Sequence, residues 1–184
     1  MLLALDISTS CTGYCLFDED KLVDIGSINL GKHKGLYEKA AHVKSAIIEL
    51  DDAYYIDRVV VEENLQAFRP GLSSAKTLMT LAQFNGVVRW ICHERLEVPV
   101  EAINVNTARK NVGLKINKKD KSKTTKEKVL EWVATDLPEI EWPTKILKSG
   151  PNKGKERICA EAYDMADAYV IGKSFLVENF KMKN

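Results

Sequence analysis

The stretch LLALDISTSCTGYCLFDEDKLVDIGSINL, which covers residues 2–30, decides the fold. It holds three apolar runs, at 2–7, 12–17 and 22–30, and the residues between them are the small polar and acidic types that favour turns. This spacing predicts three antiparallel strands joined as a meander. The segment 36–50 then repeats apolar residues at helical spacing, so a helix should follow the third strand.

The rest of the chain alternates strands and helices. The run 56–61 is β-branched and unbroken, which is typical of a central strand buried on both faces. A helix capped by Ser73 or Ser74 should run to about Glu94, and 98–103 is a last short strand. Further segments are predicted as a helical turn at 107–111, an exposed loop at 115–125, a helix at 126–134 capped by Thr124 or Thr125, an irregular segment at 138–155, and a final helix from about Arg157 to Ile171 or beyond. The order predicts an α/β protein whose mixed five-stranded sheet is flanked by helices, as in the ribonuclease H-like fold.

Length and composition are those of an ordinary globular chain. Its 184 residues, 45% hydrophobic and 29% charged, predict a single domain over 1–184. No apolar run reaches the ~18 residues of a membrane-spanning helix, and the first residues lack the basic flank of a secretory signal, so we expect a cytoplasmic protein with no membrane partner. The four cysteines have no zinc-site spacing, and we expect them to be small buried hydrophobes.

Charge is segregated along the chain although its net value is only +1. Residues 109–128 hold nine Lys or Arg against two acidic residues, a net of +7, and residues 145–157 hold five against one, a net of +4. The remainder must sum to −10. Such a distribution favours a polyanionic partner on one face, although a solvated charge run would have the same composition.

Carboxylates interrupt apolar segments at three places. Asp6 lies inside the first strand, Glu62 ends the most apolar strand, and Asp164 and Asp167 stand three residues apart on one face of the final helix. Each alone could be a turn cap, a strand-end charge or part of a solvated stripe. Together, at one end of one sheet, they would repel one another unless hard cations neutralised them. Oxygen ligands favour Mg²⁺ or Mn²⁺, and two such ions can support phosphodiester hydrolysis.

Four motifs bear a family resemblance. They are LALDISTSCTGY at 3–14, VVEE at 60–63, SAKTLMTLAQFNG at 74–86 and YDMADA at 163–168. In order and spacing they resemble the RuvC-like Holliday junction resolvases. The resemblance implies a ribonuclease H-like, homodimeric, Mg²⁺-dependent endonuclease that cleaves four-way DNA junctions and has four catalytic, metal-binding carboxylates. These carboxylates would be Asp6, Glu62, Asp164 and Asp167.

Two features depart from the family pattern. Glu63 directly follows Glu62, so the strand register leaves the ligand ambiguous by one residue, and we favour Glu62 because the family glutamate comes directly after the apolar strand residues. The segments at about 111–125 and 137–156 are longer and more basic than in compact bacterial members. They resemble bacteriophage-encoded versions, which would work in a bacterial cytoplasm and whose substrates can extend to other branched DNA.

The basic segment before the helix at 126–134 is the predicted DNA surface. The candidate phosphate-binding residues are Arg109, Lys118, Lys119, Lys121, Lys123 and Lys126. Phe68, in a loop after the catalytic strand, either stacks on an unpaired base or folds back on the core. The long helix from Ser74 is a candidate dimer surface, since two matched nicks on a two-fold junction require two active sites.

The sequence is also compatible with other activities. A broader fork or flap nuclease and a ribonuclease H would share the same metal chemistry. A non-catalytic junction-binding module would need only the basic segments. The loop from Asp6 to Gly13 also resembles the first phosphate loop of the actin-like ATPases, but 184 residues do not hold the two domains which those proteins use.

Overall fold

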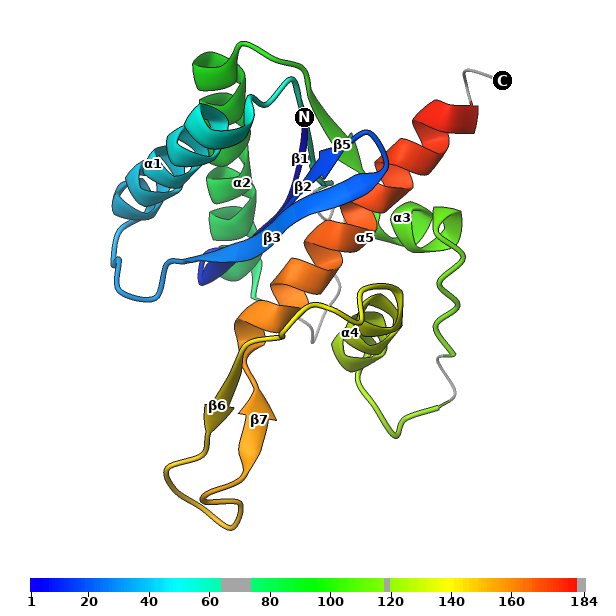
Figure 1. Cartoon of the computed structure of the whole chain (residues 1–184). Coiled ribbons are helices and arrows are strands. Elements are labelled where there is room, and N and C mark those ends of the chain that lie inside the picture. The colour runs from blue at the N-terminus through cyan, green and yellow to red at the C-terminus, as the bar shows by residue number, and fades with distance from the viewer. Residues whose placement is uncertain (64–73, 118–119, 182–184) are drawn as a thin grey trace.

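The computed structural model describes residues 1–63, 74–117 and 120–181, and its centre is a five-stranded sheet with the order β3-β2-β1-β4-β5 (Figure 1). The strands are β1 (Leu2–Ile7), β2 (Cys11–Asp18), β3 (Lys21–Asn29), β4 (Arg58–Glu62) and β5 (Val100–Ile103). The first three pair antiparallel, and β4 and β5 are added parallel to β1. The predicted mixed sheet is therefore confirmed, and so is the three-stranded meander that opens it.

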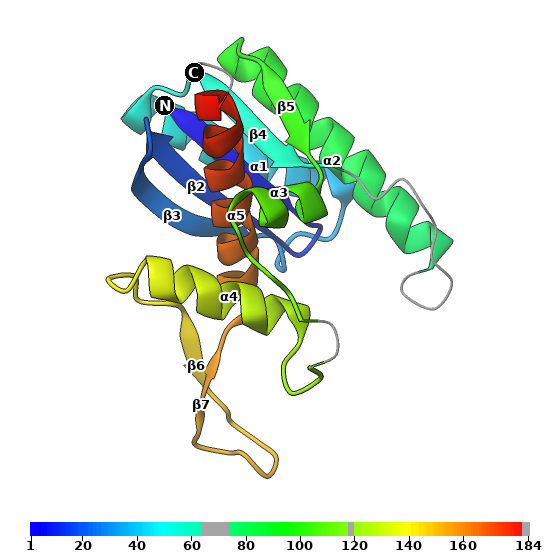
Figure 2. The same cartoon turned by 90° about the vertical axis from the view of Figure 1, so that its right-hand side faces the viewer.

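Helices cover both faces of the sheet. One face carries α1 (Leu36–Tyr54) and α2 (Ala75–Leu96), and the other carries α5 (Ala160–Lys181), against which α3 (Val105–Asn111) and α4 (Thr125–Asp136) pack (Figure 2). Strand alternation divides the core accordingly. Leu3 and Leu5 of β1 pack in the α1–α2 layer, whereas Leu2 and Ala4 pack in the α5 layer. β1 is apolar on both faces because each face packs against its own layer of helices.

Two glycines let α5 lie close against the sheet. A Cβ added to Gly13 of β2 would lie 2.1 Å from the Asp164 carbonyl oxygen, and one added to Gly172 of α5 would lie 2.4 Å from the Phe17 ring. Both distances are shorter than any side chain tolerates, so only glycine permits this approach. Gly13 is also the pairing partner of Asp6 in the β1–β2 ladder. The absence of a side chain at Gly13 thus sets the spacing between Asp6 and the helix segment that holds Asp164.

Helix starts follow local capping signals. Ser74 caps α2 by accepting a hydrogen bond from the Thr77 amide, and Ser73 lies outside the described residues. Thr124 caps α4 in a capping box with Glu127, in which each side chain accepts a hydrogen bond from the other residue's backbone amide. Of the two caps considered for each helix, the structure places Ser74 and Thr124 in that role.

The segment predicted to be irregular contains a second, two-stranded sheet. Strands β6 (Thr144–Ile146) and β7 (Glu156–Ile158) form an antiparallel hairpin that projects from the body of the molecule (Figures 1 and 2). The prediction that the last helix starts near Arg157 is therefore wrong. Arg157 pairs with Lys145 in this hairpin, and the helix begins at Ala160.

The cysteine prediction holds for three residues and fails for one. Cys11, Cys15 and Cys92 are buried, whereas Cys159 is only partly buried because it links the hairpin to α5. All four thiols are free. Across the described parts of the chain, no helix combines the length and the apolar composition needed to cross a membrane.

Candidate active site

Five carboxylates line one pocket of about 520 Å³ at the edge of the sheet, and four of them are the predicted site residues. Asp6 comes from β1, Glu62 ends β4, and Asp164 and Asp167 come from the first turns of α5. Leu5 pairs with Val61 across the parallel β1–β4 ladder, so the next residues, Asp6 and Glu62, lie side by side on neighbouring strands. The sequence prediction that these carboxylates share one end of the sheet is confirmed.

Burial makes this acidic group unusual. Asp6, Asp164 and Asp167 are each at most 7% exposed. Burial raises the pKa of Asp6 well above its ordinary value, and the charges of Asp167, Glu62 and Asp164 raise it further. Burial is also the largest cause of the raised pKa values of Glu62 and Asp167. Such a group binds protons or cations more readily than exposed carboxylates do.

Two cationic side chains neutralise part of this charge. The Lys126 Nζ donates a hydrogen bond to Asp164 Oδ1 at 2.9 Å, and Arg109 Nη2 donates to Asp167 Oδ1 at 3.3 Å. Burial alone would lower the pKa of Lys126, but the hydrogen bond and charge of Asp164 outweigh that effect and raise it. The Arg109 Nε is buried without a hydrogen-bond partner. Arg109 and Lys126, predicted as phosphate contacts, therefore lie inside the carboxylate pocket.

The donor set suits a hard divalent cation. All four acidic groups offer oxygen ligands, which Mg²⁺ and Mn²⁺ prefer, and the buried Asp6 carboxyl interacts with Glu62. Within the described ranges, no three His, Cys, Asp or Glu side chains already stand in a metal-binding arrangement. Asp164 and Asp167 are held by cationic side chains instead. The residues fit such an ion by chemistry, and binding it would require the Lys126–Asp164 ion pair to rearrange.

The neighbouring glutamates differ in their partners. Glu62 is influenced electrostatically by Asp6 and Asp167, whereas Glu63 also lines the pocket but accepts a hydrogen bond from the Asn104 amide group at 3.4 Å. Glu62 is the last residue of β4, and Glu63 lies just beyond the strand. The register thus places Glu62, rather than Glu63, beside Asp6.

Asn85 is a pocket residue to which the sequence analysis gave no role. It is 3% exposed on α2, and its amide donates to the Glu62 carbonyl oxygen at 3.4 Å. Its signal was present in the sequence, because it interrupts the apolar stripe of α2 between Leu81 and Val88. A polar residue at such a position needs a buried hydrogen-bond partner, and here that partner is the strand that bears Glu62.

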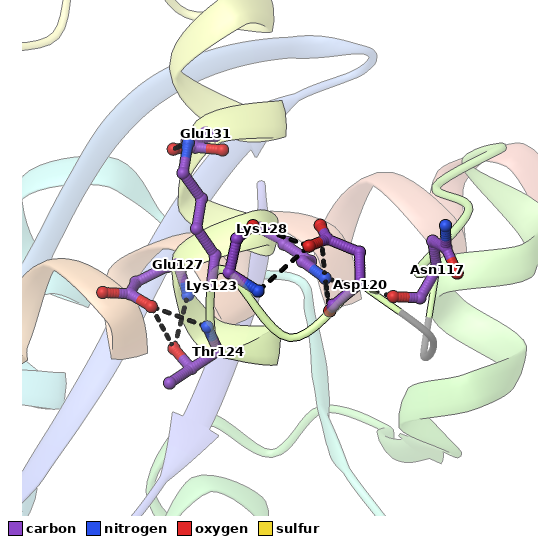
Figure 3. Close-up of polar contacts among 8 residues, drawn as sticks. Asn117, Asp120, Lys123, Thr124, Glu127, Lys128 and Glu131 are labelled. Atoms are coloured by element: carbon purple, nitrogen blue, oxygen red, sulfur yellow. Dashed lines mark hydrogen bonds and ion pairs between the residues drawn. The ribbon is translucent and has the colours of Figure 1, made fainter.

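Lys123 of the loop before α4 and Lys128 of α4 itself pair within the molecule (Figure 3). Lys123 forms an ion pair with Glu131, and Lys128 forms one with Asp120 at 3.0 Å while donating to the Asn117 carbonyl oxygen. Lys121 is exposed. The remaining candidates in this set, Lys118, Lys119 and Phe68, lie outside the described residues.

Comparison with known proteins finds similarity by structure alone. No family model and no curated protein sequence matches the chain. A structure of Thermus thermophilus RuvC in complex with a Holliday junction substrate matches with a TM-score of 0.66 and 16% identity, covering 98% of this chain and 94% of that one. A second Thermus thermophilus RuvC structure gives a TM-score of 0.60 at 16% identity, covering 98% and 96% of the two chains.

The third similar structure is the yeast mitochondrial Holliday junction resolvase Ydc2. It has a TM-score of 0.61 and 15% identity, and the match covers 99% of this chain and 80% of Ydc2. These matches extend over nearly the whole chain and agree with the resemblance of its motifs. The chain has the ribonuclease H-like fold of RuvC.

Proposed function

We propose that this chain, built on the RuvC fold, is a metal-dependent DNA endonuclease that resolves four-way junctions by paired phosphodiester hydrolysis. One observation carries the proposal. Four carboxylates from β1, β4 and α5 line a single pocket in a fold that the chain shares with junction resolvases. Four largely buried carboxylates this close together repel one another more than two cationic side chains can offset, and bound cations would remove that repulsion.

Each side chain of the pocket has a defined part in this proposal. Asp6, Glu62, Asp164 and Asp167 would hold two Mg²⁺ ions, for which Mn²⁺ would substitute. Ions bound there supply an activated water and stabilise the leaving oxygen of the cleaved phosphodiester. The Lys126 side chain is 56% exposed, so its ammonium group can leave Asp164 and pair with a DNA phosphate at the pocket mouth. Arg109, 17% exposed, stays behind the carboxylates and orients Asp167.

We also propose that two copies act together, with α2 in the dimer surface. A groove of about 580 Å³ between α1 and α2 is lined by Tyr37, Val87 and Trp90, among others. Tyr37 is 82% exposed and Trp90 60%, values that are high for large apolar side chains on a free surface. A symmetric dimer would present two pockets to a roughly two-fold junction, as paired nicking requires.

The deciding experiment is cleavage of a labelled four-way junction in Mg²⁺. Linear duplex, a fork, a flap and an RNA–DNA hybrid serve as comparison substrates, and EDTA serves as the metal-free control. We expect symmetric paired nicks confined to the junction. Equal cutting of forks and flaps would make the protein a general branched-DNA nuclease, and cutting of the hybrid alone would make it a ribonuclease H.

The two glutamates provide a matched pair of variants for the same assay. Glu62→Gln should abolish cleavage while leaving junction binding intact, because the metal ligand is lost without any change to the basic surface. Glu63→Gln removes the same charge one residue along the chain and should retain activity. Loss of cleavage in Glu63→Gln alone would transfer the ligand role to Glu63. No cleavage by the wild-type chain on any substrate would leave only a binding module.

A further inference from the structure

The β6–β7 hairpin contributes almost nothing to the core yet lies next to the acidic pocket. All residues from Thr144 to Arg157 except Leu147 are exposed, and the hairpin extends away from the sheet (Figures 1 and 2). Its second strand ends at Ile158, two residues before α5, whose Ala160 lines the pocket. At its base, Arg157 is close enough to Glu127 to help to lower the pKa of that carboxyl. Whatever binds the hairpin therefore lies beside the carboxylates.

The hairpin carries an unneutralised positive charge. Lys145, Lys148, Lys153, Lys155 and Arg157 are all exposed, and among the described residues none of them has an ion-pair partner within 4.0 Å. In segment 109–128, by contrast, Arg109, Lys123, Lys126 and Lys128 already pair with acids of the same molecule. The hairpin thus offers five exposed cations that form no ion pair within the described structure.

Like charges face each other across the two strands. Lys145 pairs directly with Arg157, so their side chains share one face of the ribbon. Lys155 precedes Arg157 by two residues, and strand alternation places it on that face too. Directly opposed cations destabilise a two-stranded ribbon, and a ribbon with three-residue strands is marginal even without repulsion. A bound polyanion would remove the repulsion and hold the ribbon in place.

We propose that the basic face of this hairpin, formed by Lys145, Lys155 and Arg157, binds the phosphate backbone of a duplex DNA arm beside the active site. The inference rests on the proposed nuclease function and adds a contact surface to it. The charge complementarity favours nucleic acid over a protein partner, because the opposite face offers one strongly exposed apolar side chain, Ile146 at 59%, which is too little for a protein interface. Lysine and arginine on a projecting ribbon contact phosphates without reading bases.

The dimensions of the hairpin suit a duplex arm. Residues 155–158, in which the Lys155 carbonyl extends the ladder by accepting a hydrogen bond from the Leu147 amide, span about 13 Å at about 3.3 Å per residue. That length corresponds to about four base pairs at 3.4 Å each. The hairpin should therefore follow one arm away from the cleavage point rather than occupy the crossover.

The test is the salt dependence of DNA binding by the full chain in EDTA, measured by fluorescence anisotropy on a four-way junction and on a linear duplex. The hairpin variant combines Lys145→Gln, Lys155→Gln and Arg157→Gln. The matched control combines Lys21→Gln, Arg58→Gln and Arg95→Gln, three exposed cations at the opposite end of the sheet. Both variants lose the same charge, so a general electrostatic effect would change them equally.

We expect the hairpin variant to lower the slope of log K against log salt by about 2.7 on both DNAs, since each lost phosphate contact removes about 0.9, and the control to change it by less than about 1. A swap variant, Lys145→Arg with Arg157→Lys, conserves the charge and should keep the wild-type slope. A hairpin variant whose slope equals that of the control would overturn the proposal. A slope that falls on the four-way junction but not on the linear duplex would overturn the assignment to a duplex arm.

Failure of the nuclease proposal can be distinguished from failure of this one. If the wild-type chain cuts no junction but the hairpin variant still lowers the salt dependence of binding to duplex, then the catalytic proposal is wrong and the proposal that the hairpin binds DNA is supported. If junctions are cut and the slope does not change, then the hairpin proposal is wrong and the catalytic one stands.

Discussion

Replacing Gly13 by alanine should increase the distance between the carboxylates of Asp6 and Asp164. The added Cβ would lie 2.1 Å from the Asp164 carbonyl oxygen, 2.2 Å from its carbonyl carbon and 2.7 Å from the Met165 nitrogen. All three are backbone atoms, so no side-chain rotation relieves the contact. Because Gly13 pairs with Asp6 across the β1–β2 ladder, α5 must move away from the strand that bears Asp6.

The size of the displacement follows from the contact distance. Real Cβ contacts essentially never fall below 3.0 Å, so the Asp164 backbone must retreat by about 1 Å. A displacement of about 1 Å between catalytic groups reduces rates by about 100-fold. Overpacking of this kind also destabilises a protein by about 1–3 kcal/mol, which for a chain of this size lowers the unfolding midpoint by about 2–4 °C per kcal/mol.

The assay is single-turnover cleavage of a four-way junction in Mg²⁺, together with thermal unfolding and junction binding in EDTA. Gly172→Ala is the stability-matched control, because its Cβ would also collide between α5 and the sheet, at 2.4 Å from the Phe17 ring. Eight residues separate Gly172 from Asp164, about 12 Å along the helix, so this variant should lose stability but keep most of its rate. Gly13→Ala with the wild-type rate, or equal rate losses in the two variants, would refute the idea that Gly13 sets the geometry of the site.

Three further changes probe the charges around the pocket and the attachment of α4 to α5. Because the pKa of Asp6 is raised, the metal-free protein loses stability as the pH rises through that pKa. Asp6→Asn removes this loss, so the variant should unfold at a higher temperature than wild type at pH 8 in EDTA, and the difference between the two midpoints should narrow toward pH 4. A variant midpoint below that of wild type at pH 8 would contradict the argument that the Asp6 charge is buried. Lys126→Gln removes the ion pair with Asp164, which is partly screened at the surface and contributes about 1 kcal/mol or less. We expect calorimetry to show a small loss of stability without metal and a larger stabilisation by Mg²⁺ than in wild type. An unchanged Mg²⁺ effect would argue against competition between the Lys126 ammonium group and the metal ion. Tyr169→Phe removes the hydrogen bond that Tyr169 donates to Asp136 at 2.5 Å and should destabilise by about 1–2 kcal/mol near pH 7. Burial acts to raise the pKa of Asp136, but Lys173 and Tyr169 outweigh it and lower the pKa, so the effect should shrink as the pH falls below about 4; an effect independent of pH would exclude the carboxylate as the relevant partner.

The parts of the fold that the sequence predicts well are those with short-range signals. Strands 2–7 and 12–17 are visible from apolar runs and turn residues, and the carboxylates stand out because each interrupts an apolar segment. The parallel register that joins Asp6 to Glu62 follows once the two strands are adjacent. These features need only local pattern and the general rule that a buried charge requires a partner.

The partners of those carboxylates could not be predicted in the same way. Arg109 is 58 residues from Asp167 in the sequence, and Lys126 is 38 residues from Asp164, so no local pattern connects them. Both residues belong to the basic segment 109–128, and composition alone assigned them to a uniform phosphate-binding surface. The hairpin was missed because its three-residue strands sit among prolines and glycines, which predict irregular structure.

The distribution of free charge changes how the molecule can meet DNA. Of the seven cations in segment 109–128 that the structure describes, four are paired with acids, namely Arg109, Lys123, Lys126 and Lys128. Ion pairs within the molecule reduce the charge available to an outside phosphate, so this segment binds DNA less strongly than its formal +7 indicates. The hairpin, with a formal net of only +4 over 145–157, has no such internal pairing in the described structure and offers nearly all of its charge. The hairpin should therefore contribute more to DNA affinity than its formal charge indicates, because pairing as well as composition decides how much positive charge reaches the surface.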